Sequence, residues 1–335
     1  MIKEYILSAL IFADAPLSEQ DLADALGIDR RSVRKRIQSL KTLGFRIDGT
    51  PSQGYLFLDA PDSLCELFLR ARLAKAPHLH VLPSLSSTNE WVKRYWRSLR
   101  HGTFLFAQEQ TKGRGRYGRS FYSPRNEGLY LSLLLKKPPL PSPFALTLAS
   151  AVAVCRVLEA LNLHPSIKWV NDIFLNGKKF GGILTEGELL GRCNTYSHLI
   201  LGIGLNINTS DFPSELDGIA TSLLQETQRC FSLNLFAVIL VEELLHMLNE
   251  LSSFSSFSPQ DSLPPALLNS YRSRLFGVGS SILYGPFESA QPTKGTLLGI
   301  TDQGALRIQT AHGVKTLQSG EIRWRPLSTS AIKDN

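Results

Sequence analysis

The chain has 335 residues, of which 43% are apolar, and it carries a formal net charge of +7. This length and apolar content exclude a wholly disordered chain and allow two or three domains, each with its own core. The longest apolar runs, 129–135 and 232–241, are too short or too interrupted to span a bilayer, and no secretion signal follows Met1, so we expect a cytoplasmic protein without a membrane segment.

The cysteines indicate the cellular compartment, and the distribution of charge indicates the class of ligand. The four cysteines are scattered, with no spacing typical of a metal site or a disulfide framework, and they indicate thiols of a reducing cytoplasm. Residues 61–130 hold twelve Lys and Arg against five Asp and Glu, whereas the segments on either side are balanced. We therefore expect an anionic small ligand or an acidic partner at this segment, rather than a uniformly basic coat.

The first sixty residues predict a winged helix-turn-helix. Apolar residues at helical spacing indicate a helix over 2–11, Ser18 caps a second helix that Gly27 ends, and Asp29 caps a third helix over 30–43. Two short strands around residues 48–54 then form a hairpin. In this motif the third helix enters the DNA major groove with its first residues. Its candidate DNA contacts are Arg30, Arg31, Ser32, Arg34 and Lys35.

The alternative for this segment is a basic, solvated helix in a small helical cap. We expect the seven cations from Arg30 to Arg46 to face no acidic residue, although the sixty residues are neutral overall, and this favours DNA binding. One basic face on a neutral domain predicts modest affinity per monomer. We therefore expect a dimer on a two-part operator.

A second domain begins after a connecting helix within 61–75. A predicted strand at 79–82 leads to Ser87-Thr88-Asn89, and a helix follows over 91–99. These three polar residues form either the N-cap of that helix or a turn that presents hydroxyl, amide and N–H groups to a ligand.

The most distinctive stretch runs from Gln110 to Arg119, between predicted strands at 104–107 and 128–135. It places four cations and three glycines within ten residues, without a carboxylate. Glycine lets the backbone approach a ligand closely, and arginine donates to carboxylate and phosphate oxygens. The pattern predicts a loop that wraps an anion and is too flexible to keep its shape alone. The alternative is a solvated basic loop that contacts nucleic acid.

Polar residues interrupt the apolar runs that follow a long helix over 144–161. The run 167–175 is interrupted by Lys168, Asn171 and Asp172, and Lys179 stands between an Asn-Gly hairpin turn and a double glycine that includes Gly182. Such groups are costly unless they are paired or bind a ligand.

A central strand over 199–208 ends with Asn206 and Asn208. A second loop, over 209–221, that could close over a ligand comes next, and a helix covers 233–251. After a Ser/Pro-rich connector at 252–265, five short strands at 280–284, 294–300, 305–310, 314–317 and 321–324 predict a small β-barrel. Arg325 either reaches a nucleotide or is a solvated strand end.

Several of these motifs, taken in order, resemble those of biotin protein ligases. They are Ser87-Thr88-Asn89, Gln110 with Gly113-Arg114-Gly115-Arg116 and Gly118-Arg119, Lys168-Trp169 with Asn171-Asp172, Lys179 with Gly181-Gly182-Ile183-Leu184, and Gly204-Leu205-Asn206-Ile207-Asn208. With the winged domain, the chain resembles the bifunctional bacterial form, which is both ligase and biotin-operon repressor. The resemblance implies an α+β multidomain protein with a winged helix-turn-helix at 1–60. It further implies a mixed-sheet α/β catalytic domain similar to class II aminoacyl-tRNA synthetases at 61–270, and a barrel similar to Src-homology-three modules at 271–335.

In that family ATP and biotin give biotinyl-5′-adenylate, and a lysine of the biotin carboxyl carrier protein of acetyl-CoA carboxylase then takes the biotinyl group. The resemblance implies Mg²⁺ with the ATP, no metal site of the protein's own, operator DNA as a partner, and a homodimer when adenylate is bound. It assigns catalysis to Lys179, Arg116 and Arg114. Biotin and adenylate binding fall to Ser87, Thr88, Asn89, Gln110, Arg114, Gly115, Arg116, Lys179 and Gly182. Further nucleotide contacts are assigned to Arg119, Lys168, Asn171, Asp172, Asn206, Asn208 and Arg325.

Three points stay open at the level of sequence. Val170 stands where the family often has proline, and the second loop lacks the tryptophan that stacks on adenine in some relatives. Asp172 is a candidate to orient the metal, the incoming lysine or Lys168. The alternative functions are a ligase whose amino-terminal domain does not regulate transcription, and a lipoate- or octanoyl-transferring enzyme of related fold, against which the arginine loop and the winged domain argue.

Overall fold

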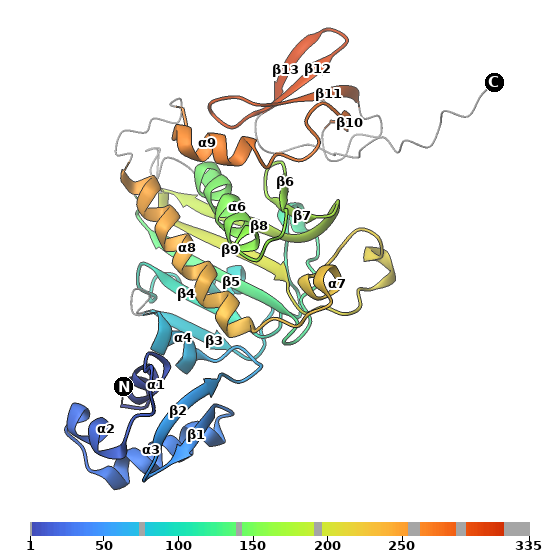
Figure 1. The fold of residues 1–335 in the computed structure, drawn as a ribbon. Coiled ribbons are helices and arrows are strands. Elements are labelled where there is room, and N and C mark those ends of the chain that lie inside the picture. Colours follow the sequence, from blue (N-terminus) through green and yellow to red (C-terminus); the bar gives the residue numbers. More distant parts are fainter. Residues whose placement is uncertain are drawn as a thin grey trace.

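The computed structural model describes residues 2–73, 78–138, 143–190, 196–253, 262–285 and 293–317. The amino-terminal domain, a central domain built on one large sheet and a small carboxyl-terminal sheet follow one another along the long axis of the molecule (Figure 1). No helix in these ranges is long and apolar enough to cross a membrane.

The predicted winged helix-turn-helix is confirmed. It consists of α1 (Ile2–Ile11), α2 (Glu19–Leu26), α3 (Arg30–Thr42) and the antiparallel hairpin of β1 (Arg46–Thr50) and β2 (Gly54–Asp59). Ser18 and Asp21 form a capping box on α2, and Asp29 accepts a hydrogen bond from the Ser32 N–H at the start of α3. Gly27 ends α2 at φ 62°, a conformation that glycine adopts without a steric cost.

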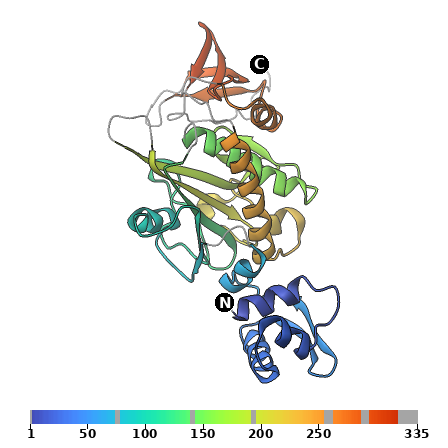
Figure 2. The same cartoon turned by 90° about the vertical axis from the view of Figure 1, so that its left-hand side faces the viewer.

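The central domain is a seven-stranded mixed sheet in the order β3-β4-β5-β9-β8-β7-β6. The strands are β3 (Leu79–Leu82), β4 (Thr103–Ala107), β5 (Gly128–Lys136), β6 (Ser166–Lys168), β7 (Asp172–Leu175), β8 (Lys178–Leu189) and β9 (Tyr196–Asn206). Only the β3–β4 pair is parallel among these. The helices α6 (Pro143–Glu159) and α8 (Leu233–Ser253) cover one face (Figure 1), and α5 (Thr88–Tyr95) lies on the other (Figure 2).

Three predicted elements of this domain have different bounds. The run 167–175 is two strands, β6 and β7, because the chain turns at 169–171 and the strands then pair antiparallel. The helix predicted over 91–99 begins at Thr88, so the polar turn is its first turn, and it ends at Tyr95. The connecting helix is α4 (Glu66–Arg72). A short 3-10 turn (Ser214–Leu216) and α7 (Leu223–Thr227) lie in and after the second loop.

The carboxyl-terminal part contains α9 (Pro265–Arg272) and a four-stranded antiparallel sheet of β10 (Ser281–Tyr284), β11 (Thr293–Ile300), β12 (Leu306–Thr310) and β13 (Gly313–Leu317). The fifth predicted strand and Arg325 lie outside the described residues. The turn between β11 and β12 packs on the start of α6, where a Cβ at Gly304 would lie 2.6 Å from the Phe144 ring. This close approach fixes the small sheet against the central domain.

Two side chains of the central domain hold the segment that leaves the wing. The buried Asn234 amide, in the first turn of α8, donates to the carbonyls of Pro61 and Ser63 at 2.7 and 2.9 Å and accepts from the Cys65 N–H at 2.8 Å. Gln108, directly after β4, donates to the Leu64 carbonyl at 2.9 Å. The amino-terminal domain is therefore joined to the central domain by a fixed segment.

Candidate active site and DNA-binding face

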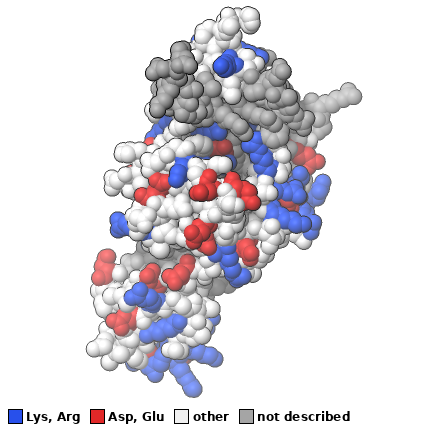
Figure 3. All heavy atoms as spheres, turned by 90° about the vertical axis from the view of Figure 1, so that its right-hand side faces the viewer, with Lys and Arg blue, Asp and Glu red and all other residues white. Residues whose placement is uncertain are grey.

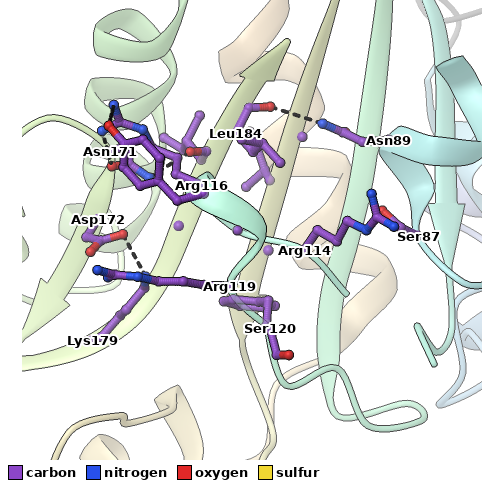
Figure 4. A pocket seen from close by; sticks show the side chains of 18 of the residues that line it. Ser87, Asn89, Arg114, Arg116, Arg119, Ser120, Asn171, Asp172, Lys179 and Leu184 are labelled. Atoms are coloured by element: carbon purple, nitrogen blue, oxygen red, sulfur yellow. Dashed lines mark hydrogen bonds and ion pairs between the residues drawn. The ribbon is translucent and has the colours of Figure 1, made fainter. Parts of the chain in front are cut away.

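A cavity of about 560 Å³ lies on the face of the sheet formed by β8 and β9. The first turn of α5, the arginine loop and the turn between β6 and β7 complete it. Arg116, Asn171, Asp172 and Lys179 lie on one side of the cavity, and Ser87, Asn89 and Arg114 lie on the other (Figure 4). The predicted residues that line the cavity are Ser87, Thr88, Asn89, Gln110, Arg114, Gly115, Arg116, Arg119, Lys168, Asn171, Asp172, Lys179 and Gly182.

The polar turn at the start of α5 lines the cavity and forms the first turn of the helix. Ser87 occupies the N-cap position, but its side chain makes no capping hydrogen bond. Gln110 supplies the cap instead, because its Oε1 accepts from the Thr88 N–H at 2.8 Å and from the Thr88 hydroxyl at 3.2 Å. Its Nε2 donates to Ser123 at 3.0 Å. The alternative in which these residues cap the helix with their own side chains is therefore wrong, and the cap supplied by Gln110 leaves the Ser87 hydroxyl free of a capping role.

The arginine loop has a folded shape of its own. The Gly115 N–H donates to the Arg119 carbonyl at 2.7 Å, and the Phe121 N–H donates to the Gly113 carbonyl at 2.9 Å. A Cβ at Gly113 would lie 2.4 Å from the Phe121 carbonyl oxygen, so this position requires glycine. These two bonds close a compact turn, and that the loop is too flexible to keep this shape without a ligand stays a prediction.

Each of the three assigned catalytic cations is held by a partner on the cavity wall or rim. The Lys179 ammonium lies 2.7 Å from the Asp172 carboxylate, and Arg114 donates to Glu90 at 3.0 Å. Arg116 donates to the Asn171 side-chain oxygen at 3.3 Å. Asp172, which had three candidate roles, thus pairs with a fourth partner, Lys179.

Lys168 adds a further positive group to the cavity, and this group is partly removed from water. Burial lowers the pKa of this ammonium, the Asp172 carboxylate opposes that effect, and the nearby Lys179 and Arg119 reinforce it. Asp172 is the one carboxylate among the described residues that line the cavity, so positive charge dominates there. An anionic ligand relieves this imbalance.

The second loop reaches the site through its backbone. The Lys179 N–H donates to the Ile219 carbonyl at 2.8 Å, and the Thr221 N–H donates to the Lys179 carbonyl at 2.9 Å. Asn206 lies outside the cavity and holds the end of this loop, because its amide donates to the Thr221 carbonyl at 3.0 Å. Asn208 makes two hydrogen bonds with the Phe231 backbone. Both asparagines therefore stabilise neighbouring backbone segments in this structure.

Some lining residues were not among the assigned site residues, although Trp169, Ile183, Leu184 and Gly204 stand in the motifs. Trp169 lines the cavity and donates from its indole N–H to the Gly304 carbonyl in the carboxyl-terminal sheet, at 2.9 Å. Phe121 covers Gly204, where a Cβ would lie 2.6 Å from the ring. The remaining ones are Tyr117, Ser120, Ile183, Leu184, Gly202 and Ile203. The alternating glycines of β9 were the available signal, because glycine inside a strand often marks a close approach.

The basic helix α3 carries the predicted DNA-binding residues on its surface. Lys and Arg side chains gather at the free end of the amino-terminal domain (Figure 3). Arg30, Arg31, Arg34 and Lys35 are exposed, whereas the Ser32 hydroxyl donates to Asp29 at 2.6 Å within the helix cap.

The expectation that these cations face no acidic residue is wrong, because Glu19 of α2 and Asp59 of β2 pair with three of them. Glu19 of α2 is fully buried and accepts two hydrogen bonds from Arg34, both at 2.8 Å, and one from the Tyr55 hydroxyl at 2.9 Å. Arg30 lies 3.9 Å from the same carboxylate. Arg34 therefore ties α3 to α2, and it is not simply a cation that faces solvent.

The comparisons with known proteins follow the order of the three parts. Models described as "HTH domain", "Biotin/lipoate A/B protein ligase family" and "Biotin protein ligase C terminal domain" match residues 3–56, 81–206 and 287–323. The bifunctional ligase/repressor BirA of Bacillus spizizenii is 33% identical over 318 residues, which cover 91% of this chain and 93% of that relative. BirA of Escherichia coli is 28% identical over 313 residues, 92% of each chain.

The solved structures agree with this assignment. The biotin protein ligase from Aquifex aeolicus, in complex with biotin and ATP, is 29% identical and superimposes with a TM-score of 0.64 over 74% of this chain and 99% of that chain. The shared fold and the cation-lined cavity define a ligase catalytic domain joined to a helix-turn-helix. The chain belongs to the biotin protein ligase family, in the arrangement of its bifunctional ligase/repressors.

Proposed function

We propose that this protein activates biotin with ATP and transfers the biotinyl group to a lysine of the biotin carboxyl carrier protein of acetyl-CoA carboxylase. We propose further that it represses the biotin operon. The observation that supports the enzymatic role most strongly is the meeting of Arg114, Arg116 and Lys179, from two separate segments, on one cavity. The neutral polar groups Ser87 and Asn89 lie across it and suit an uncharged ureido ring (Figure 4).

The first step joins two anions. A carboxylate oxygen of biotin attacks the α-phosphorus of ATP, the new O–P bond forms, and the bond to the β-phosphate oxygen breaks, so that pyrophosphate leaves. Arg116 and Lys179 offset the repulsion between the two reactants and hold them in line. In the second step the amine of the acceptor lysine attacks the acyl carbon, loses a proton, and displaces AMP.

Mg²⁺ enters this scheme with the nucleotide. Magnesium is commonly held by substrate phosphates and one or two carboxylates, rather than by a cage made of protein alone. Asp172 fits this role as the carboxylate on the cavity wall, and within the described residues no group of three His, Cys, Asp or Glu side chains forms a metal site. Magnesium would neutralise the polyphosphate, while Asp172 also orients Lys179.

The regulatory role is supported by the exposed cations of α3 and by the fixed segment between the domains. We propose that adenylate orders the two loops beside the cavity and stabilises a homodimer that binds paired half-sites. We also propose domain boundaries at 1–60, 61–270 and 271–335. A cytoplasmic location is supported by the free thiols of Cys65, Cys155 and Cys230.

Two experiments test the proposal. Purified protein is mixed with biotin and ATP labelled at the α-phosphate; a retained biotinyl-AMP supports the ligase, and its absence, or an equal product with octanoate or lipoate, refutes biotin specificity. Operator binding is then measured with and without biotin and ATP. Binding that strengthens with both ligands supports the repressor, whereas an active ligase that never binds operator is a ligase with a non-regulating amino-terminal domain.

A further inference from the structure

The side-chain amide of Asn89 is fixed by three partners around it. Asn89 is buried, with 4% of its surface exposed, and lines the cavity at the second position of α5. Its Nδ2 donates to the Leu184 carbonyl at 3.2 Å and to the Glu186 carboxylate at 2.8 Å, and its Oδ1 accepts from the Ser132 hydroxyl at 2.6 Å (Figure 4 shows the bond to Leu184).

This set of partners permits one orientation of the amide. A backbone carbonyl and an ionised carboxylate only accept hydrogen bonds, so the atom that faces Leu184 and Glu186 must be the NH₂ group. Both of its hydrogens are then used. The oxygen lies toward Ser132 and Gly202, where a Cβ on Gly202 would stand 2.4 Å away, and it keeps a second lone pair.

We propose that Glu186 is a positioning residue for the ligand, acting through Asn89. Glu186 stands on β8 and is not among the residues that line the cavity, and its other carboxylate oxygen lies 3.9 Å from Lys93. By holding Nδ2, it makes Asn89 present an acceptor and not a donor to the cavity. The inference rests on the proposed function: the ligand group that meets this acceptor is a ureido N–H of biotin.

The consequence is a specific change in affinity for biotin. Without the carboxylate, the Leu184 carbonyl is the one remaining group that can only accept from Nδ2, since the Ser132 hydroxyl can donate or accept. The flipped form of the amide then places an NH₂ group against the ureido N–H. A lost or reversed hydrogen bond of this kind corresponds to roughly a tenfold change, since 1.4 kcal/mol is a factor of ten. The nucleotide side of the cavity does not contact Glu186 and keeps its properties.

The test compares Glu186→Ala, Glu186→Gln and Glu188→Ala. Glu188 is the matched control, because it stands two residues along the same strand with an exposed side chain. Biotin affinity is measured by calorimetry, and KM for biotin, KM for ATP and kcat by pyrophosphate release. We expect about tenfold weaker biotin binding in Glu186→Ala, less in Glu186→Gln, which can hold either orientation, and no change in Glu188→Ala. The ATP constant and kcat should stay within twofold.

A second ligand separates positioning from a general structural effect. In a cyclic carbamate analogue of biotin, an oxygen replaces one ureido N–H, and both regioisomers are measured. The ratio of wild-type to Glu186→Ala affinity should fall to about one for the isomer that lacks the N–H facing Asn89. An unchanged ratio for both isomers, or equal biotin affinity in wild type and Glu186→Ala, overturns the inference. Absence of biotin binding by the wild type instead overturns the proposed function.

Discussion

Lys179 forms an ion pair with the Asp172 carboxylate on the wall of the cavity. The ion pair with Asp172, at 2.7 Å, holds the Lys179 ammonium between β7 and β8 and occupies one oxygen of the Asp172 carboxylate. A phosphate that enters this space shares an ammonium whose position is already set. A positioned positive charge of this kind stabilises most strongly the negative charge that develops in the transition state.

We therefore expect Lys179→Ala and Arg116→Ala to slow adenylate formation by a factor of about 100 or more, since removal of one positioned donor to a developing charge costs this much. Pyrophosphate release in single-turnover conditions measures the step. Lys178→Ala is the matched control, because Lys178 is the exposed neighbour on the same strand. Unchanged pyrophosphate release in both cavity variants would refute the assigned roles.

At the scale of elements, α2 and α3 are joined by a buried acid. The hydrogen bonds from Arg34, with a smaller contribution from Tyr55, hold the pKa of Glu19 below its ordinary value of 4.5, although burial acts in the opposite direction. A lowered pKa means that the ionised form stabilises the folded domain at neutral pH. This contribution is complete above about pH 4.5 and is lost as the pH falls through the lower, folded-state value.

Glu19→Gln should therefore reduce the stability of the amino-terminal domain by about 1–3 kcal/mol at pH 7, because the carboxylate loses its charge-assisted bonds. The difference from the wild type should shrink as the pH falls below about 4.5. Hydrogen exchange of the α3 amides in the full chain, corrected for intrinsic rates, measures it. A difference that is equal at pH 7 and pH 3.5 would contradict this account.

Because Arg34 is bonded to Glu19, substitutions of other cations of α3 are the better test of DNA binding. Arg31→Ala and Lys35→Ala should each weaken operator binding and lower the slope of log K against log salt by about 1, as for a lost phosphate contact. Arg34→Ala should also destabilise the domain, so its loss of binding is not diagnostic. Arg94→Ala removes the same charge from the exposed face of α5 and should leave the salt slope unchanged.

The local sequence pattern predicted most helices and strands of the three parts. It failed where the structure depends on contacts between residues that lie far apart in the sequence. Caps at Ser18 and Asp29 are visible because each cap and its partner lie within three residues. The bend between β6 and β7 was hidden because the run 167–175 was taken as one element, although Lys168, Asn171 and Asp172 interrupt it at the turn. The pairs Arg34 with Glu19 and Lys179 with Asp172 depend on how elements pack, which spacing does not encode.

At the scale of the whole molecule, one asparagine fastens the DNA-binding domain. Asn234→Ala should lower the stability of the chain by about 1–3 kcal/mol, since two carbonyls and one N–H of residues 61–65 lose their partner. Thermal unfolding measures this loss, with the exposed Asn249→Ala on the same helix as control. Equal melting temperatures for the two variants would show that the segment is held by other contacts.

The bond from the Trp169 indole to Gly304 crosses 135 residues of sequence. One residue of the cavity wall, Trp169, is thus held by a piece of chain that is synthesised much later than the wall itself. A nascent polypeptide cannot make this bond until residue 304 has been added, and a shortened gene product that stops before residue 304 leaves the indole without this acceptor. The cavity's described cations all lie between Arg114 and Lys179, yet the indole beside them gains this hydrogen-bond acceptor only when the carboxyl-terminal sheet has been synthesised.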